Sequence, residues 1–350
     1  MRSEGECALC GAPASSFLGV CRDCILNRWD EAEKHVREAH ARARRELGLP
    51  PEPPREGKRC GVCVNDCRIP EGERGFCGVV VNKDGQLVRE HRGRAYLDSH
   101  PTNCVGAWVC PGATSAGYPK YTDTKGPERG RYNLAVFYAG CSHHCFFCQN
   151  HEHWVEEERL EADRLARRAR DEDVTCVCFF GGDPTPHYDQ VLEVGEEWEE
   201  LSVRVCLETN GSLDPRIMRR IAEICYESGG GFNMDVKAYD PRVYYALTGS
   251  DPENTFKNLE LIGEEFYRED PPILRPSVLI VPGYVTPEEV EKIAEFLASV
   301  NESIPLKLLQ HVPHYHSLDL GYTPVRVMRE CKRAAERHLE RVEACIYRYA

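Results

Sequence analysis

Six short apolar segments, separated by helical patterns, constrain the fold of this chain more than any other feature. They end in Gly, Pro or polar residues and cover residues 133–140, 175–182, 204–211, 232–239, 273–283 and 305–313. Between them, apolar residues recur on one helix face, as Val290, Ile293 and Leu297 do. Alternating strands and helices indicate parallel strands joined by right-handed crossovers. The sequence therefore predicts a parallel α/β domain over residues 132–350, ending in an amphipathic helix over about 324–347.

The chain before this domain has a different organisation. Residues 1–25 contain two Cys-x-x-Cys pairs, and residues 26–59 hold a charged helical stretch followed by a Pro-rich linker. A second Cys-rich segment, residues 60–131, leads into the α/β domain. We therefore expect two small Cys-rich modules ahead of one larger domain.

Composition narrows the class of protein. The chain has 350 residues, 41% of them hydrophobic, which is enough for a buried core. It shows no apolar signal segment and no membrane-length apolar run, so we expect a cytoplasmic protein with no membrane partner. The net charge of −13 argues against nucleic acid as a partner. In a reducing compartment, 19 cysteines in clusters predict metal sites rather than disulfides.

Three cysteines lie in one short loop directly after the first apolar segment, at Cys141, Cys145 and Cys148. Thiolates at these spacings can each reach a different iron of one [4Fe–4S] cube, which normally has four cysteine ligands. The fourth iron would then stay open to a ligand that is not protein. A zinc ion completed by His143 or His144 is the alternative for the same loop.

Polar and Gly-rich motifs follow the next three apolar segments, where a parallel α/β fold places its chemistry. The motif "GGDPTP" begins at Gly181 and "ETNG" begins at Glu208. Asp235 and Lys237 stand two residues apart, so they face the same side of a strand. Glycines let the backbone approach a ligand, and a carboxylate can bind an ammonium group. For Asp235 and Lys237, a buried ion pair that only stabilises the fold is the alternative.

The cysteine loop and these motifs together resemble the radical S-adenosylmethionine (SAM) superfamily. Within it, "GGDPTP", "ETNG" and "NMDVK" are similar to segments of pyruvate formate-lyase activating enzymes and of radical SAM proteins of the AmmeMemoRadiSam system. Asp183 stands where that pattern usually has Glu. The resemblance covers roughly residues 60–340 and implies a (β/α)6 partial TIM barrel.

The resemblance also implies the cofactors and their contacts. It places a [4Fe–4S] cluster on the three loop cysteines and SAM on the open iron. Phe147, directly before the third cysteine, is expected near the adenine. The other expected SAM contacts are Gly181, Gly182, Asp183, Glu208, Asn210, Asp235 and Lys237. In the superfamily, an electron from the cluster cleaves SAM to methionine and a 5′-deoxyadenosyl radical. No catalytic residue beyond the cluster ligands is expected.

Two further cysteine sets predict metal sites. The first set, in the ribbon-like pattern CxxC-x10-CxxC typical of structural zinc, is Cys7, Cys10, Cys21 and Cys24. Rubredoxin-type iron is its alternative. The second set resembles the Cys-rich leader that precedes the radical core in the same group, and consists of Cys60, Cys63, Cys67 and Cys77. Its spacing leaves zinc and an auxiliary Fe–S cluster open, and Cys104 and Cys110 are candidate extra ligands.

The remaining cysteines are expected to be small buried hydrophobes. Cys176, Cys178 and Cys206 fall within apolar strand segments. Cys331 and Cys345 fall on one stripe of the final helix expected over 324–347.

Together these features predict a radical SAM enzyme that abstracts hydrogen from a substrate. By resemblance, the target is a glycine of a partner enzyme, which would make the chain an activase of a glycyl-radical enzyme. Radical modification of another protein, a peptide or a small metabolite is the alternative chemistry. A non-catalytic iron–sulfur or zinc protein for electron transfer or docking is the alternative class. The expected partners are a one-electron donor such as ferredoxin or flavodoxin, and a protein substrate.

Overall fold

A computed structural model describes residues 5–171 and 173–347. All six expected strands are present and parallel. They are β8 (Tyr132–Tyr138), β9 (Val174–Gly181), β10 (Arg204–Thr209), β11 (Gly231–Met234), β12 (Ser277–Ile280) and β13 (Leu306–Gln310). Parallel bridges from Phe232 to Leu274 and from Asp235 to Ser277 join β11 to the β12 side. The strands therefore form two sheets, one ending at β11 and one beginning at β12, which these bridges join into the expected α/β partial barrel.

Two strands that the sequence did not predict extend these sheets. The strand β7 (Gly93–Ser99) pairs antiparallel with β8, and β14 (Val342–Cys345) pairs parallel with β13. The expected helix over 324–347 is therefore wrong in its second half: α10 (Val325–Ala335) ends early, and Cys345 lies in a strand. The reason is that β13 otherwise has an open edge, whose backbone groups β14 satisfies by hydrogen bonding.

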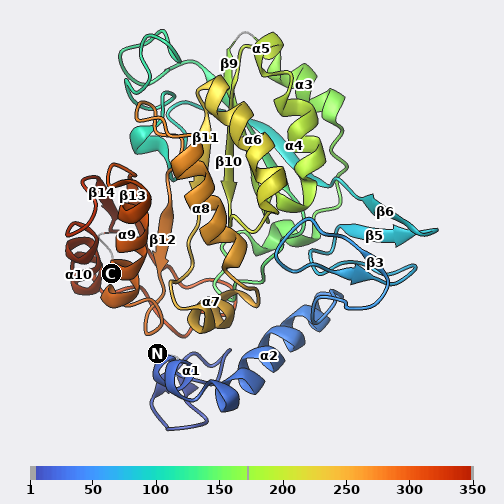
Figure 1. The fold of residues 1–350 in the computed structure, drawn as a ribbon, viewed down its shortest axis with the longest axis vertical. Coiled ribbons are helices and arrows are strands. Elements are labelled where there is room, and N and C mark those ends of the chain that lie inside the picture. Colours follow the sequence, from blue (N-terminus) through green and yellow to red (C-terminus); the bar gives the residue numbers. More distant parts are fainter. Residues whose placement is uncertain (1–4, 172, 348–350) are drawn as a thin grey trace.

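Helices cover the outer face of the barrel (Figure 1). They are α3 (Ala162–Ala169), α4 (Tyr188–Gly195), α5 (Trp198–Leu201), α6 (Pro215–Ser228), α7 (Pro241–Thr248), α8 (Glu253–Glu265) and α9 (Pro287–Asn301), followed by α10. Local sequence sets the ends of α6: the Asp214 side chain accepts from the Arg216 amide, and Gly229 stops the helix at a φ of 80°. Among the described residues, no helix is long and apolar enough to cross a membrane.

The N-terminal module packs against the barrel. It comprises β1 (Gly5–Glu6), β2 (Pro13–Ala14) and α1 (Arg22–Asn27), and the long helix α2 (Trp29–Glu46) leads away from it (Figure 1). The buried Tyr284 hydroxyl fastens this module by accepting from the Ser15 amide at 2.9 Å and donating to the Val20 carbonyl at 2.8 Å. The leader segment forms two small hairpins, β3 (Lys58–Arg59) with β4 (Arg68–Ile69), and β5 (Val80–Lys83) with β6 (Gln86–Arg89).

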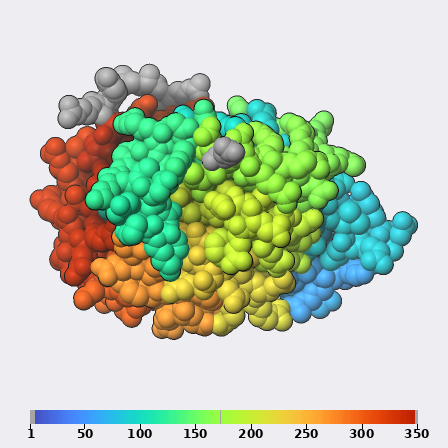
Figure 2. Space-filling model, turned by 90° about the horizontal axis from the view of Figure 1, so that it is seen from above, coloured from blue at the N-terminus to red at the C-terminus, as the bar shows by residue number. Residues whose placement is uncertain are grey.

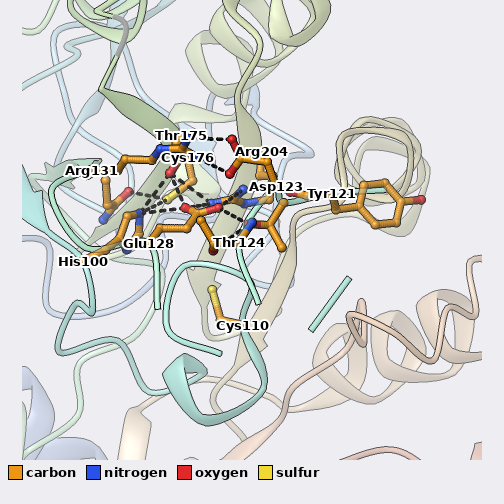
Figure 3. A network of polar contacts seen from close by, with 12 residues as sticks. His100, Cys110, Tyr121, Asp123, Thr124, Glu128, Arg131, Thr175, Cys176 and Arg204 are labelled. Atoms are coloured by element: carbon orange, nitrogen blue, oxygen red, sulfur yellow. Dashed lines mark hydrogen bonds and ion pairs between the residues drawn. The ribbon is translucent and has the colours of Figure 1, made fainter. Parts of the chain in front are cut away.

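The segment 100–131 covers the end of the barrel where the parallel strands begin. Seen from above, it lies as a teal layer across that end (Figure 2). A buried network anchors it, in which Arg204 of β10 donates to both carboxylate oxygens of Glu128, at 2.9 and 2.6 Å (Figure 3). Hydroxyl groups of Thr122 and Thr175 donate to the same carboxylate at 2.7 and 2.6 Å. This end of the barrel is therefore closed, and the opposite end holds the candidate site.

Candidate functional site

A cavity of about 190 Å³ lies at the carboxyl ends of the parallel strands. All three cysteines of the loop after β8 line it: Cys141, Cys145 and Cys148. Glu208 at the end of β10, and Asp235 and Lys237 just after β11, line the same cavity. The sequence motifs, far apart in the chain, therefore meet in one place.

The cysteine loop is held by backbone contacts on several sides. Gly140 enters the loop at a φ of 72°, and a Cβ there would lie 2.5 Å from the Cys77 carbonyl oxygen. The Cys141 amide donates to that same carbonyl at 3.3 Å, and the His144 amide donates to Thr248 at 2.7 Å. The loop position is therefore fixed by the fold before any metal binds.

Both loop histidines have polar partners of their own, although His143 also lines the cavity. His143 Nε2 lies 2.9 Å from the Tyr244 hydroxyl, and burial lowers the pKa of His143 to about 3. His144 Nδ1 lies 3.4 Å from His40 Nδ1, and its Nε2 lies 3.3 Å from the Tyr315 hydroxyl. These contacts occupy the ring nitrogens that a zinc site would need. The geometry therefore does not favour the zinc alternative for this loop.

The three thiols are buried away from water. Burial raises the pKa of Cys145 to about 11 and that of Cys148 to about 12, and it raises the pKa of Cys141 well above its usual range. Without a metal these groups stay protonated at neutral pH. A bound metal deprotonates such thiols because the metal charge stabilises the thiolate. The Asn210 side-chain amide, 3.7 Å from Cys141 Sγ, is a hydrogen-bond donor to this sulfur.

The opposite wall carries ionisable groups. Lys237 and Asp235 form an ion pair, while the second Asp235 oxygen is buried with no hydrogen-bond partner among the described residues. Burial, reinforced by the Asp235 charge, raises the pKa of Glu208 to about 7. The wall thus offers a cation and two acidic groups, and one oxygen of Asp235 has no partner in the described chain.

Glycines bring two strand ends close enough to form the floor. Gly181 and Gly182 line the cavity. A Cβ on Gly181 would lie 2.2 Å from the Tyr138 amide nitrogen, and one on Gly182 would lie 1.9 Å from the Gly140 carbonyl oxygen. Only glycine fits at either position. Phe147 also lines the cavity, with its ring centroid 5.8 Å from Lys237 Nζ.

Asp183 is placed differently from the expectation. It is buried but does not line the cavity. Its carboxylate accepts from the Thr185 amide at 2.7 Å, the Thr209 hydroxyl at 3.0 Å and the Asn210 amide at 3.1 Å. Asp183 therefore holds the ends of β9 and β10 together, and it presents Thr209 and Asn210 to the cavity.

Several cavity residues escaped the sequence analysis. Gln149, Asn150 and Trp154 follow the third cysteine and line the cavity, and the Trp154 indole nitrogen is buried with no partner in the described chain. Their position in the sequence, directly after the three-cysteine motif, could have indicated that they lie at the cavity. Val105 also lines the cavity, although it comes from the segment before β8, and nothing local indicated this.

The residues present fit a [4Fe–4S] cluster with SAM. Three thiols can bind three irons and leave the fourth open. One unpartnered oxygen of Asp235 and the indole nitrogen of Trp154, which has no partner in the described chain, suit a ligand that carries both an amino group and a carboxylate. Lys237 adds a positive charge for that carboxylate.

The other cysteine sets lie apart from this cavity. The sulfurs of Cys7, Cys10, Cys21 and Cys24 all lie within 4.8 Å of one another, a spacing that suits one metal ion. The leader set lines a second, smaller cavity. Cys104 and Cys110 do not line that cavity, and Cys104 Sγ instead accepts from the Asn233 side chain at 3.0 Å inside the barrel. They are therefore not extra ligands of the leader.

The structure is an α/β partial barrel with a three-cysteine cavity at the carboxyl ends of its strands, and a comparison with known families is consistent with this class. Residues 135–297 match the family described as the Radical SAM superfamily. The matched residues contain the cysteine loop and the three strand-end motifs, so this part of the chain is similar to the radical SAM superfamily.

Individual relatives resemble parts of the chain. A 91-residue stretch is 33% identical to 7-carboxy-7-deazaguanine synthase of Hyperthermus butylicus, covering 25% of this chain and 39% of that protein. Streptococcus suis SuiB bound to its precursor peptide SuiA is a structural neighbour with a TM-score of 0.50 and 18% identity, over 62% of this chain and 49% of SuiB. A domain of pyruvate-formate lyase-activating enzyme from Bacteroides vulgatus aligns at a TM-score of 0.39 and 18% identity, over 49% of this chain and 99% of that domain.

Proposed function

We propose that this protein reductively cleaves SAM and uses the resulting radical to abstract hydrogen from a substrate. The supporting observation is that Cys141, Cys145 and Cys148 line one buried cavity with Glu208, Asp235 and Lys237. When bound, the cluster supplies the electron that breaks a carbon–sulfur bond of SAM. The residues of this chain bind and orient SAM and keep water from the radical.

Each group of the wall has a distinct task in this proposal. Lys237 pairs with the SAM carboxylate, and Asp235 and Glu208 accept hydrogen bonds from its amino group. Asp183 does not contact SAM in this proposal. It positions Thr209 and Asn210 by accepting hydrogen bonds from the Thr209 hydroxyl and the Asn210 amide. Phe147 provides an apolar face for the adenine, as its position in the motif implies.

For the substrate, we propose a protein or peptide, with a glycine of a partner enzyme as the first candidate. The support is the likeness of the strand-end motifs to activating enzymes, and SuiB shows that a protein of this fold can bind a peptide. We further propose a cytoplasmic location, ferredoxin or flavodoxin as electron donor, and zinc in the compact Cys7/Cys10/Cys21/Cys24 site.

The proposal is tested by anaerobic reconstitution with iron and sulfide, reduction, addition of SAM, and measurement of 5′-deoxyadenosine. We expect product from the wild type and none above background from Cys145→Ala. Cluster-loaded wild type that forms no product would refute SAM cleavage. The absence of any glycyl-radical enzyme from the organism would remove the activase target only.

A further inference from the structure

The four leader cysteines surround a cavity of their own. Cys60, Cys63, Cys67 and Cys77 all line it, and Thr185 and Pro186 of the "GGDPTP" turn form part of its wall. Thr185 is 3% exposed, and it packs against this cavity on the side of the turn. Four cysteines therefore line a site directly behind the proposed SAM-binding turn.

The arrangement of these sulfurs differs from that of a zinc site. A zinc ion with Zn–S bonds of about 2.3 Å places its four sulfurs only about 3.8 Å apart. Within the described ranges, only the set Cys7, Cys10, Cys21 and Cys24 brings three or more ligand atoms within 4.8 Å of one another. The leader cysteines instead surround a cavity, as Cys141, Cys145 and Cys148 do. Wider spacing around a cavity suits a cluster whose corners each bind one thiolate.

We propose that the leader cysteines hold an auxiliary [4Fe–4S] cluster that passes electrons to the SAM site. Hydrogen bonds to sulfur support this. The Phe76 amide donates to Cys67 Sγ at 3.5 Å, as the His143 amide donates to Cys141 Sγ at 3.4 Å. Donors of this kind stabilise thiolates and raise the reduction potential of a cluster.

The two cysteine sets are in direct backbone contact. The Cys141 amide donates to the Cys77 carbonyl at 3.3 Å, so one hydrogen bond joins a ligand residue of each set. Asn65, beside Cys63, donates through its side chain to the Ser142 carbonyl at 2.6 Å. An electron therefore has a short path between the sites that runs entirely through packed protein.

A buried cation serves both sets. Arg44 of α2 is 1% exposed, donates to the Phe76 carbonyl, and lies over the Phe76 ring at 3.5 Å. Burial lowers the pKa of Arg44 to about 10, and thiolates at Cys77 and Cys141, once a metal has deprotonated them, would oppose this shift. One positive charge between two thiolate sets offsets the cost of burying both.

The electron balance is simple. The auxiliary cluster gains one electron from a reduced one-electron donor and gives it up across the Cys77–Cys141 contact, with no bond formed or broken. Cluster binding stands on the leader geometry alone. The delivery role rests on the proposed function, because it needs an electron acceptor at the SAM site.

Metal content tests the cluster without any activity. In the full chain carrying Cys141→Ala, Cys145→Ala and Cys148→Ala, reconstitution should leave about four iron and four sulfide per chain, with a reducible EPR signal. The wild type should hold about eight iron. Adding Cys63→Ser and Cys77→Ser should remove the remaining iron, whereas Cys225→Ser and Cys331→Ser, also buried, should leave it. Zinc in place of iron in the leader, or only about four iron in the wild type, would overturn the proposal.

Electron delivery has a separate readout. With reduced ferredoxin or flavodoxin, the Cys63→Ser/Cys77→Ser variant should cleave SAM at least about tenfold more slowly than the wild type. With a small chemical reductant, the two should agree within about twofold. Equal rates with the protein donor would overturn the delivery role. Iron in the triple variant together with no SAM cleavage by the wild type would refute the proposed function and leave the auxiliary cluster standing.

Discussion

The two ends of the barrel both bury cysteines and charged side chains, but they differ in how the central acidic groups are partnered. Where the strands begin, the Glu128 carboxylate receives hydrogen bonds from Arg204, Thr122 and Thr175 (Figure 3). Where the strands end, one oxygen of Asp235 and the indole nitrogen of Trp154 have no partner in the described chain. At this second end the unpartnered groups line a cavity together with the three loop cysteines.

Whether buried polar groups have partners distinguishes a network that stabilises the fold from a site that can bind a ligand. A buried polar network that satisfies its own members stabilises one conformation, and nothing is gained by adding a ligand. Buried groups without partners carry a desolvation cost that a ligand can remove. The same residue types therefore anchor a covering segment at one end and form a binding site at the other.

The largest expected effect is on SAM cleavage, when the same Cys→Ala substitution is made in the cysteine loop and, as a control, in strand β9. Cys145 and Cys178 are 8% and 7% exposed, so they are a matched pair. Cys145→Ala should reduce 5′-deoxyadenosine formation by at least about 1,000-fold, because one cluster ligand is lost. Cys178→Ala should keep activity within about twofold and cost about 1 kcal/mol of stability. Comparable losses of activity in both variants would break the comparison.

A substitution at the end where the strands begin should instead lower the free energy of unfolding and leave the SAM site intact. Glu128→Gln should cost about 3 kcal/mol, because it leaves the Arg204 charge buried without its counter-ion. SAM affinity should not change. The control is Glu330→Gln, which removes an exposed ion pair with Arg326 and should cost less than about 0.5 kcal/mol. Thermal unfolding of the two variants, measured anaerobically, checks this, and equal melting temperatures would contradict it.

A smaller effect is expected on SAM binding. Lys237→Met should weaken SAM binding about 30-fold, equivalent to about 2 kcal/mol, because the SAM carboxylate loses its buried cation. Lys307→Met, in β13 beside Glu343, should bind SAM as the wild type does. Equilibrium dialysis without reductant measures both. Wild-type affinity in Lys237→Met would assign the Asp235–Lys237 pair to fold stability alone.

The smallest effect is a pH dependence. Because the pKa of Glu208 is raised to about 7, its carboxyl loses its proton between about pH 6 and 8. The ionised form attracts the positive groups of SAM, so SAM affinity should rise about fivefold over this range. Glu208→Gln should show a flat profile. A wild-type affinity that falls with rising pH would give the wrong sign for this role.

Local sequence patterns were sufficient to predict the barrel strands and most of the cavity wall. Cys141, Gly181, Glu208 and Lys237 belong to short motifs at strand ends, and parallel strands bring such ends together. What the sequence did not predict depends on long-range pairing. The strand β14 forms because β13 has an open edge, yet its apolar residues Val342 and Cys345 also fit a helical spacing.

Asp183 shows a second limit of motif reading. Its position in "GGDPTP" pointed to SAM, but three donors from two strand ends use its carboxylate. The contact between Cys77 and Cys141 was equally hidden, since 63 residues separate the two in the chain. Both depend on how loops pack, which spacing along the chain does not encode.

The most direct test of the central claim is electron–nuclear double resonance on the reduced protein with SAM labelled with 15N at its amino group. The account predicts a 15N coupling to the cluster held by Cys141, Cys145 and Cys148, which is lost on unlabelled SAM and absent from Cys145→Ala. A cluster-loaded, reduced wild type that binds SAM but shows no nitrogen coupling would contradict coordination of SAM at the open iron.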